Sequence, residues 1–281
     1  MKLATLKNGT PAAIKQGESI PLSELGFDGS LLTLVKSKKS TRDQVRDALS
    51  QYTSGGQPVS AADFAAPVSN PSKIVAIGLN YLDHASESDM EVPETPLVFA
   101  KFSNSIISAT DAIEIPLDLT REVDYEVELG IVIGKKAKNI SPGQALDHVF
   151  GYTIINDVSA RDLQFSDKQW VRGKSLDTFC PTGPVIVTAD EISDPQNLDI
   201  GCSVNGETLQ EANTKDMVFG VAELVSRLSH SFTLEAGDLI ASGTPQGVGF
   251  SRKPPVYLTP GDTVRTWISG IGELTNPVEE A

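Results

Sequence analysis

Two glutamates, Glu126 and Glu128, stand two residues apart in the segment 124–130, DYEVELG, and a third acid, Asp157, follows in NDVSARD at 156–162. Side chains alternate along a β-strand, so residues i and i+2 point to the same side. Two carboxylates placed side by side repel each other unless a positive charge lies between them. Because oxygen atoms are the only donors nearby, the pattern predicts a site for one hard cation, Mg²⁺ or Mn²⁺ rather than zinc.

The alternative is a solvated strand face. Glu122 and Asp124 share the parity of the glutamate pair, and a run of acids at even positions is also typical of an exposed strand edge. The residues that follow, Leu129 to Gly134, are apolar and largely β-branched, so the strand is expected to continue into a core. Spacing alone leaves both interpretations open.

A second segment of interest, GLNYLDHASE at 78–87, contains His84 and comes directly after a predicted buried strand. Histidine is the side chain best suited to move protons near neutral pH. His84 and Glu87 are three residues apart, so one helical turn would place the carboxylate where it could orient the imidazole. The alternative is a surface turn with solvated charges. His148 and His230 have no such partner and are expected to be structural.

Two more segments have features of anion sites. Gly173-Lys-Ser resembles the end of a phosphate-binding loop, but Lys168 occupies the place of the required glycine, which excludes nucleotide binding of that type. Lys174 is then either an interior cation facing the acids or an exposed lysine. The segment SGTPQGVG at 242–249 is either a tight turn or a loop whose backbone amides and Thr244 hydroxyl approach an anion.

Composition narrows the possible partners. The formal net charge of −14 over 281 residues argues against nucleic acid and anionic membranes. It does not argue against a small anionic substrate, because a bound cation can reverse the local field. Cys180 and Cys202 form no CxxC pair, and no apolar run approaches the length of a membrane span. We therefore expect a cytoplasmic protein with two buried thiols and no membrane partner.

The chain divides by pattern into two parts. Residues 1–70 predict a small α+β domain with an edge strand at Met1–Leu6, and residues 71–281 carry all the chemical motifs. Strands are expected in the second part, including Val127–Ile133, with one clear helix capped by Asn213 or Thr214. Regular βα alternation is missing, which argues against a doubly wound sheet or a (β/α)₈ barrel. The predicted class is α+β, mainly β.

Taken in order, the motifs resemble the fumarylacetoacetate hydrolase family over residues 72–278. The matching stretches are 78–84, 124–130, 151–162, 174–175 and 243–249. The resemblance is closest to bacterial members of the acylpyruvate hydrolase and oxaloacetate decarboxylase branch. It implies a mixed β-sandwich roll with few helices, assembled as a homodimer.

The resemblance also implies roles for individual residues. Glu126, Glu128 and Asp157 match the ligands of Mg²⁺ or Mn²⁺. His84 and Glu87 match a dyad that activates water and lies on a lid, here residues 83–96, that orders on ligand binding. The positions that match contacts to a small anionic 2-oxo acid are Arg161, Gln164, Lys174, Thr244, Tyr81 and Lys101.

Family membership leaves the reaction open, because members cleave, decarboxylate or isomerise small 2-oxo acids. We expect C–C bond hydrolysis of a 2,4-dioxo acid of acylpyruvate type through a metal-bound pyruvate enolate, with His84 as the base and Lys174 beside the developing charge. The alternatives are decarboxylation of oxaloacetate, isomerisation of an unsaturated hydroxy-diacid, and non-enzymatic capture of a dicarboxylate. The His84–Glu87 pair argues against simple capture, which needs no general base.

Overall fold

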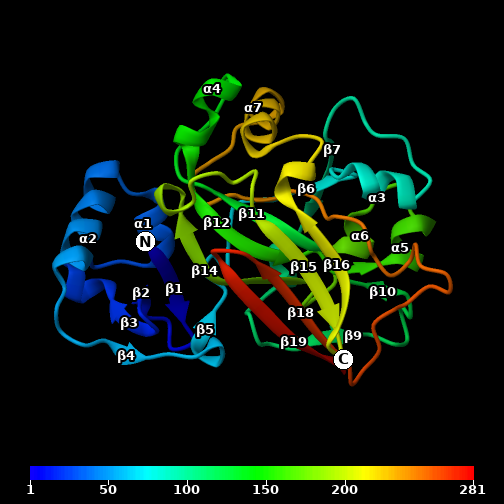
Figure 1. Cartoon of the computed structure of the whole chain (residues 1–281), viewed down its shortest axis with the longest axis horizontal. Coiled ribbons are helices and arrows are strands. Elements are labelled where there is room, and N and C mark those ends of the chain that lie inside the picture. The colour runs from blue at the N-terminus through cyan, green and yellow to red at the C-terminus, as the bar shows by residue number, and fades with distance from the viewer.

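Short apolar segments separated by turns form two large sheets in the computed structural model, which describes residues 1–281 (Figure 1). The larger sheet has twelve strands in the order β4-β3-β2-β1-β14-β12-β11-β17-β6-β7, with β5 beside β1 and β8 beside β14. The smaller has five, in the order β16-β15-β18-β19-β9, and β10 pairs with β13. The strands are β1 (Lys2–Leu6), β2 (Pro11–Lys15), β3 (Glu18–Pro21), β4 (Gln57–Pro58), β5 (Phe64–Ala65), β6 (Ile74–Gly78), β7 (Leu97–Lys101), β8 (Ile106–Ile107), β9 (Ile113–Ile115), β10 (Val123–Asp124), β11 (Val127–Ile133), β12 (Val149–Asn156), β13 (Ser159–Ala160), β14 (Cys180–Thr188), β15 (Asp199–Val204), β16 (Glu207–Asn213), β17 (Leu239–Ala241), β18 (Thr263–Ile268) and β19 (Gly272–Glu280).

Helices lie at the margins of the sheets (Figure 1). Most are short, and none has the length and apolar composition that crossing a membrane requires. The helices are α1 (Leu31–Lys36), α2 (Lys39–Gln51), α3 (Leu82–Glu87), α4 (Pro142–Ala145), α5 (Arg161–Ser166), α6 (Val171–Lys174) and α7 (Val221–Ser231).

The two sheets pack face to face around one apolar core. Strands β11, β12 and β14 of the larger sheet contact β15, β18 and β19 of the smaller one. Every residue of β11 is buried, as expected for a strand covered on both faces. A core of 44 residues fills the space between the sheets, and a second core of 20 includes residues of α1 and α2. The predicted class, α+β and mainly β, is confirmed.

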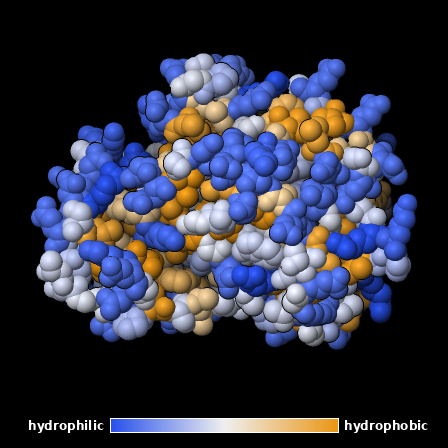
Figure 2. Space-filling model, in the orientation of Figure 1, coloured by the Kyte–Doolittle hydropathy of each residue, from blue (hydrophilic) through white to orange (hydrophobic).

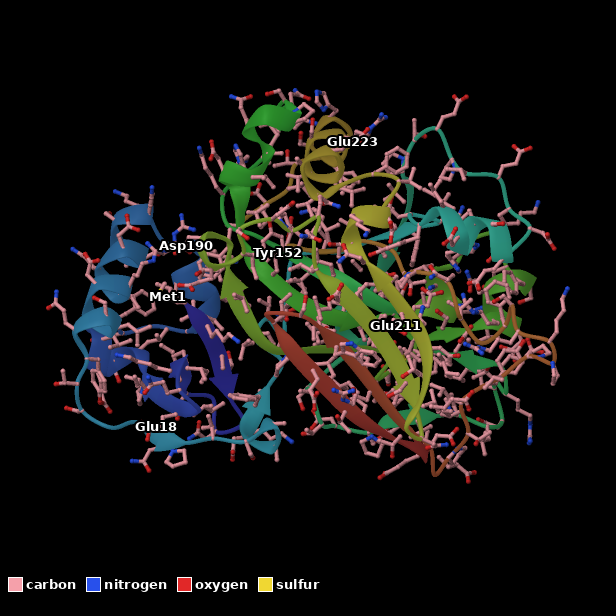
Figure 3. The ribbon with its side chains drawn as sticks, in the orientation of Figure 1. Met1, Glu18, Tyr152, Asp190, Glu211 and Glu223 are labelled. Atoms are coloured by element: carbon pink, nitrogen blue, oxygen red, sulfur yellow. The ribbon has the colours of Figure 1, made fainter.

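The N-terminal segment is joined to the larger sheet through β1. This strand pairs with both β2 and β14, so the prediction of an edge strand at Met1–Leu6 is wrong. The amino group of Met1 also holds β1 against the end of β14, since it donates to Thr188 Oγ1 at 2.5 Å and to Glu191 Oε1 at 2.9 Å. Figure 3 labels Met1 beside Asp190 at this junction. The division into domains of residues 1–70 and 71–281 stays a prediction.

The start of α7 also differs from expectation. Its N-cap is Gly220, not Asn213 or Thr214. The Asn213 side chain instead accepts from Lys215 N–H and caps a single 3₁₀ turn at Thr214–Asp216. By contrast, the predicted strand Val127–Ile133 has the same bounds as β11. Local capping signals are shared by short and long helices, which is why the sequence placed this helix too early.

The outer surface is largely polar. On the face drawn in Figure 2, hydrophilic residues cover most of the molecule, with smaller hydrophobic patches between them. Large apolar side chains exposed elsewhere include Leu97, Val98 and Phe102, in and just after β7 at the end of the larger sheet.

Replacing Leu129 by alanine should destabilise the fold strongly, because this fully buried β11 side chain lies in the inter-sheet core. The expected loss of unfolding free energy is about 2–5 kcal/mol, measured by urea denaturation. Leu146→Ala is the matched control, because Leu146 is 45% exposed, and it should cost about 0.5 kcal/mol or less. Similar losses in the two variants would contradict this placement of the core.

Candidate metal centre and active site

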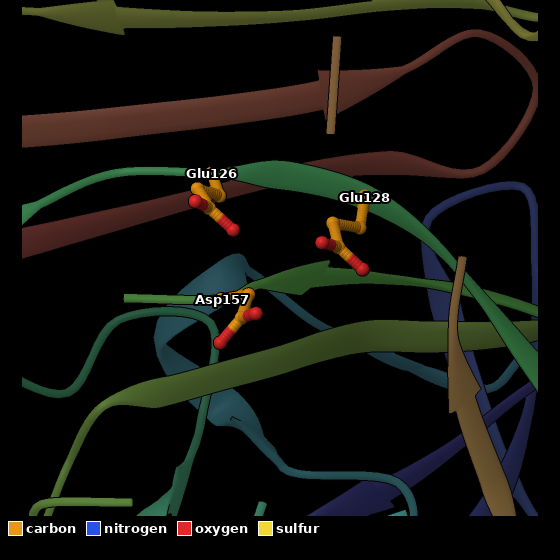
Figure 4. Close-up of side chains that lie close together, drawn as sticks. All are labelled: Glu126, Glu128 and Asp157. Carbon is orange, nitrogen blue, oxygen red and sulfur yellow. The ribbon is translucent and has the colours of Figure 1, made fainter. Parts of the chain in front are cut away.

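The pairing of β11 with β12 brings the three predicted acids together. Val127 lies opposite Asn156, so Glu126 and Asp157 meet just beyond the paired ends, and Asp157 N–H donates to the Glu126 carbonyl at 2.8 Å. Glu128 is the second residue of β11. Figure 4 shows the three carboxylates directed toward one another, and one oxygen from each lies within 4.8 Å of the others. All three are buried, which excludes the solvated strand face.

Cationic side chains hold two of the three acids. Glu126 Oε1 lies 2.6 Å from Arg161 Nη2, and its Oε2 lies 2.7 Å from Lys174 Nζ. Asp157 is paired with Lys174 at 2.8 Å and with Lys101 at 2.7 Å. Burial alone would raise the pKa of Glu126, but Lys174 and Arg161 outweigh it and lower this pKa to about 2. Glu126 is therefore ionised at any ordinary pH.

Glu128 has no cationic partner. Its Oε2 accepts one hydrogen bond, from Gly243 N–H at 2.9 Å. Burial raises the pKa of Glu128 well above its ordinary value, and the neighbouring charges of Asp157 and Glu126 raise it further. A lone buried carboxylate beside two others is costly unless a positive charge compensates it. Three converging oxygen donors with one charge left uncompensated fit a hard divalent cation held by Glu126, Glu128 and Asp157.

Lys174 is an interior cation, as one of the two sequence interpretations predicted. It ends α6, and its ammonium bridges Glu126 and Asp157 and lies 5.1 Å from the centre of the Phe99 ring. Burial alone would lower the pKa of Lys174, but Asp157 and Glu126 raise it above its ordinary value. The side chain stays protonated and is a donor of positive charge, not a base.

Lys101 has partners within the protein for its whole ammonium group. Besides Asp157, it donates to the backbone carbonyls of Lys174 and of Val158, the latter at 3.3 Å. It is buried at the end of β7 and does not line the cleft described below. Its predicted contact with substrate stays a prediction, while the geometry shows it supporting Asp157.

A small cleft opens next to the acids, and Glu126 and Lys174 are among its lining residues. Polar and aromatic side chains both line it, and Phe99 packs edge-on against Trp170 with ring centres 5.3 Å apart. Tyr81 lies outside the lining, and its buried hydroxyl has no hydrogen-bond partner. The polar lining includes His84, Glu126, Arg161, Gln164, Lys174 and Thr244, and the aromatic lining is Phe99, Phe165, Trp170 and Phe250.

The predicted histidine–glutamate pair forms on α3. His84 Nδ1 lies 2.8 Å from Glu87 Oε1, and the helical turn that their spacing predicted is present. The second carboxylate oxygen, Glu87 Oε2, accepts from Gly247 N–H at 2.9 Å. With its Nδ1 proton directed to Glu87, the imidazole has Nε2 available as a base. Because His84 lines the cleft, this base faces the space next to Glu126.

Gln164 and Thr244 are held in defined orientations. Arg161 Nη1 donates to Gln164 Oε1 at 2.9 Å, which leaves the Gln164 amide nitrogen as the free donor. The Thr244 hydroxyl donates to the Val127 carbonyl at 3.0 Å and accepts from Gln210 at 2.8 Å. Its proton is therefore engaged, and the contact of this hydroxyl with a substrate anion stays a prediction. The backbone N–H of Thr244 makes no hydrogen bond within the protein.

Sequence reasoning missed Asp124. Its spacing was compatible with an exposed edge as well as with a buried site, but Asp124 is fully buried, and its Oδ2 accepts from Arg161 Nε at 2.9 Å. The available signal was the even spacing of Asp124 with Glu126 and Glu128, which fits a buried position and an exposed edge equally well. Gly249, in the glycine-rich segment 242–249, packs closely, because a Cβ there would lie 1.9 Å from the Val256 carbonyl oxygen.

Known proteins resemble this chain in sequence, and solved structures resemble it in fold. Residues 73–279 match the family model described as fumarylacetoacetate (FAA) hydrolase C-terminal. A mitochondrial oxaloacetate tautomerase from Xenopus laevis is 52% identical over 215 residues, 76% of this chain and 67% of that protein. Its human counterpart FAHD2A is 48% identical over 223 residues, 79% of this chain and 71% of that protein.

Solved structures agree over the full length. A fumarylacetoacetate hydrolase from Exiguobacterium antarcticum has a TM-score of 0.86 and 39% identity, covering 100% of both chains. Maleylpyruvate hydrolase from Sphingobium sp. SYK-6, solved with manganese(II) and pyruvate, has a TM-score of 0.84 and 31% identity, again covering 100% of both chains. The expected homodimer is tested by neither comparison and stays a prediction.

The comparisons contradict the predicted location. The similar proteins from Xenopus laevis, human and Bos taurus are named as mitochondrial, so the prediction of a cytoplasmic protein is wrong. It rested on composition and on two free buried cysteines. These show only that the fold needs no disulfide, which does not identify a compartment.

The match to the family model and the relatives with about half of their residues identical lead to one conclusion. This chain belongs to the fumarylacetoacetate hydrolase family and is an enzyme of that family.

Proposed function

We propose that this enzyme interconverts the keto and enol forms of oxaloacetate, or of a closely similar small 2-oxo dicarboxylic acid, with Mg²⁺ or Mn²⁺ as its cofactor. The observation that carries the proposal is His84, which is paired with Glu87 and lines the same cleft as Glu126 and Lys174. A general base therefore lies in the same cleft as the groups that could bind a substrate anion. This arrangement suits the transfer of one proton in a small acid. The names of the Xenopus laevis and human relatives favour oxaloacetate.

The cation would be held by Glu126, Glu128 and Asp157. When bound, it supplies Lewis-acid polarisation of the 2-oxo group and charge compensation for the adjacent carboxylate. The related maleylpyruvate hydrolase structure contains manganese and pyruvate, which supports a metal and a small 2-oxo acid at this kind of site.

Lys174 and Thr244 would bind the head of the substrate. Two of the three Lys174 N–H groups point to Glu126 and Asp157, so one remains to donate to a substrate oxygen. The free backbone N–H of Thr244 is a second donor for a carboxylate. The Gln164 amide nitrogen, oriented by Arg161, is available to a far carboxylate.

His84 would transfer the proton. Its Nε2 takes a proton from C3 of the keto form, the electrons of that C–H bond form the C2–C3 double bond, and negative charge moves to the 2-oxo oxygen. Lys174 stabilises this charge, and His84 returns the proton to the same oxygen to give the enol. Glu87 stabilises the imidazolium between the two transfers.

Hydrolysis of an acylpyruvate is the second candidate, favoured by the related maleylpyruvate hydrolase. In this reaction His84 would take its proton from water, which attacks the C4 carbonyl. Decarboxylation of oxaloacetate would need no such base. Loss of His84 should therefore reduce hydrolysis more than decarboxylation.

A parallel assay tests these alternatives. The enol absorbance of oxaloacetate reports tautomerisation, and a lactate dehydrogenase couple reports pyruvate released from oxaloacetate or acetylpyruvate, each with and without Mn²⁺. Enol–keto exchange without pyruvate release supports the tautomerase. Pyruvate from acetylpyruvate would support the hydrolase, and pyruvate from oxaloacetate alone would support a decarboxylase. No reaction with either would direct the search to isomerisation of hydroxy-diacids.

Replacing His84 by alanine should lower kcat for oxaloacetate tautomerisation by about 10²–10⁴-fold, because the proton-transferring group is removed. Stopped-flow loss of the enol absorbance measures this. His230→Ala is the matched control, since His230 is exposed on α7 and its ring has a single hydrogen-bond partner, the Ser226 carbonyl at 2.8 Å. Full activity in the His84 variant would remove His84 from the mechanism.

Glu128→Gln should stabilise the metal-free protein and abolish its stabilisation by Mn²⁺. The pKa of Glu128 is raised in the folded protein, so the stability that its protonated form gives is complete below the ordinary value of 4.5. That stability is lost as pH rises through the folded-state pKa. Melting temperatures should be measured by calorimetry with EDTA and with Mn²⁺. In EDTA, the melting temperature of wild type should fall more steeply than that of the variant as pH rises.

Glu273→Gln is the control for this comparison, because Glu273 is an exposed partner of Arg265 far from any predicted ligand in sequence. It should leave the response to Mn²⁺ unchanged. Equal stabilisation of wild type and Glu128→Gln by Mn²⁺ would show that Glu128 is not a ligand.

A further inference from the structure

Asp124 is a buried carboxylate that the proposed reaction does not use. Its Oδ2 lies 2.9 Å from Arg161 Nε, 2.8 Å from Arg161 Nη2 and 3.0 Å from Phe250 N. Its Oδ1 accepts from Gly249 N–H at 2.7 Å and from Tyr125 N–H at 2.8 Å. A carboxylate that is fully buried and bonded on both oxygens has a fixed position.

Through Arg161, this carboxylate acts on a predicted metal ligand. Arg161 Nη2 lies between Asp124 Oδ2 and Glu126 Oε1, at 2.8 Å and 2.6 Å. The same guanidinium donates to Gln164 and lies over the Phe250 ring, 4.4 Å from its centre. Because Asp124 holds Arg161 from one side, Glu126 shares this cation and does not receive its whole charge.

The charge count of the cluster shows why sharing matters. When Glu128 is ionised, as it must be to bind a cation, four carboxylates face three cations, so the group carries one negative charge apart from that of the divalent cation. Without the charge of Asp124 the group would be neutral, and cation binding would lose electrostatic attraction. The carboxylates are Asp124, Glu126, Glu128 and Asp157, and the cations are Lys101, Arg161 and Lys174.

Asp124 also holds the loop that receives the lid helix α3. Gly249 and Phe250 N–H groups bind Asp124, while Gly247 N–H in the same loop binds Glu87. The fit requires glycine at 249, where a Cβ would lie 2.7 Å from Asp124 Oδ1. One carboxylate therefore connects the loop beneath Glu87 with the arginine beside Glu126.

We propose that Asp124 is a positioning residue for both halves of the site. It holds Arg161 so that Glu126 can bind the divalent cation, and it holds the loop 247–250 so that Glu87 can orient His84. The inference rests on the cation site proposed above.

The test is the affinity of the full-length protein for Mn²⁺, measured by titration calorimetry on wild type and Asp124→Asn. Asparagine keeps the size and one acceptor oxygen for the loop amides, but it removes the charge that faces Arg161. The dissociation constant for Mn²⁺ should rise by about 10–100-fold, the usual effect of losing a residue that supports a metal ligand. At saturating Mn²⁺, kcat should stay below the wild-type value because the loop under Glu87 is loosened.

Asp238→Asn is the matched control. Asp238 is also fully buried and paired with a lysine, Lys73, but it lies at the other end of β17 from Thr244. This variant should lose stability with no change in Mn²⁺ affinity.

A double variant, Asp124→Asn with Arg161→Gln, separates positioning from simple support of the fold. It restores the single negative charge of the cluster, so it should bind Mn²⁺ more tightly than Asp124→Asn alone. Absence of this recovery, or equal Mn²⁺ affinity in wild type and Asp124→Asn, would overturn the role of Asp124. Absence of Mn²⁺ binding by wild type would instead overturn the cation site, and the inference with it.

Discussion

The cost of burying carboxylates close together determines how this site is built. Glu126, Glu128 and Asp157 place ligand oxygens within 4.8 Å of one another, where water cannot screen them. The fold compensates two of the three with buried cations and leaves Glu128 with a single backbone hydrogen bond. A divalent cation is the most direct remedy for the charge that is left. The uncompensated acid and the proposed cofactor are thus two consequences of one constraint.

The β-sandwich makes that constraint possible. Strand β11 is covered on both faces, and its register with β12 places the acids at the point where the pairing ends. Core packing therefore sets the separation of the predicted ligands, while short helices carry the side chains that would act on the substrate. His84 on α3 and Lys174 at the end of α6 reach the cleft from different segments. This division lets members of one fold family share a cation site and differ in the reaction performed.

Most of the fold and much of the site could be predicted from the sequence, because both depend on local patterns. The bounds of β11 and the turn that joins His84 to Glu87 follow from residue spacing. The convergence of the three acids was one of two interpretations that spacing left open. Features that depend on distant partners were missed. Asp124 has the same spacing whether it is solvated or paired with Arg161, and β1 has the same composition at an edge or between β2 and β14. The proton of the Thr244 hydroxyl is engaged by strand β11, which no motif reveals.

The charge count then accounts for the kind of substrate that the site would favour. With Glu128 ionised, the buried cluster carries one net negative charge, and a divalent cation would change it to one net positive charge. A 2-oxo acid brings at least one negative charge to a cleft that both Lys174 and Arg161 line. The metal and the substrate carboxylate next to it would therefore leave the buried group neutral, which is the cheapest condition for a closed, poorly hydrated site. The far carboxylate of a dicarboxylic acid would add one negative charge at the other end of the substrate. A neutral substrate would leave the positive charge in place, so the same balance disfavours it.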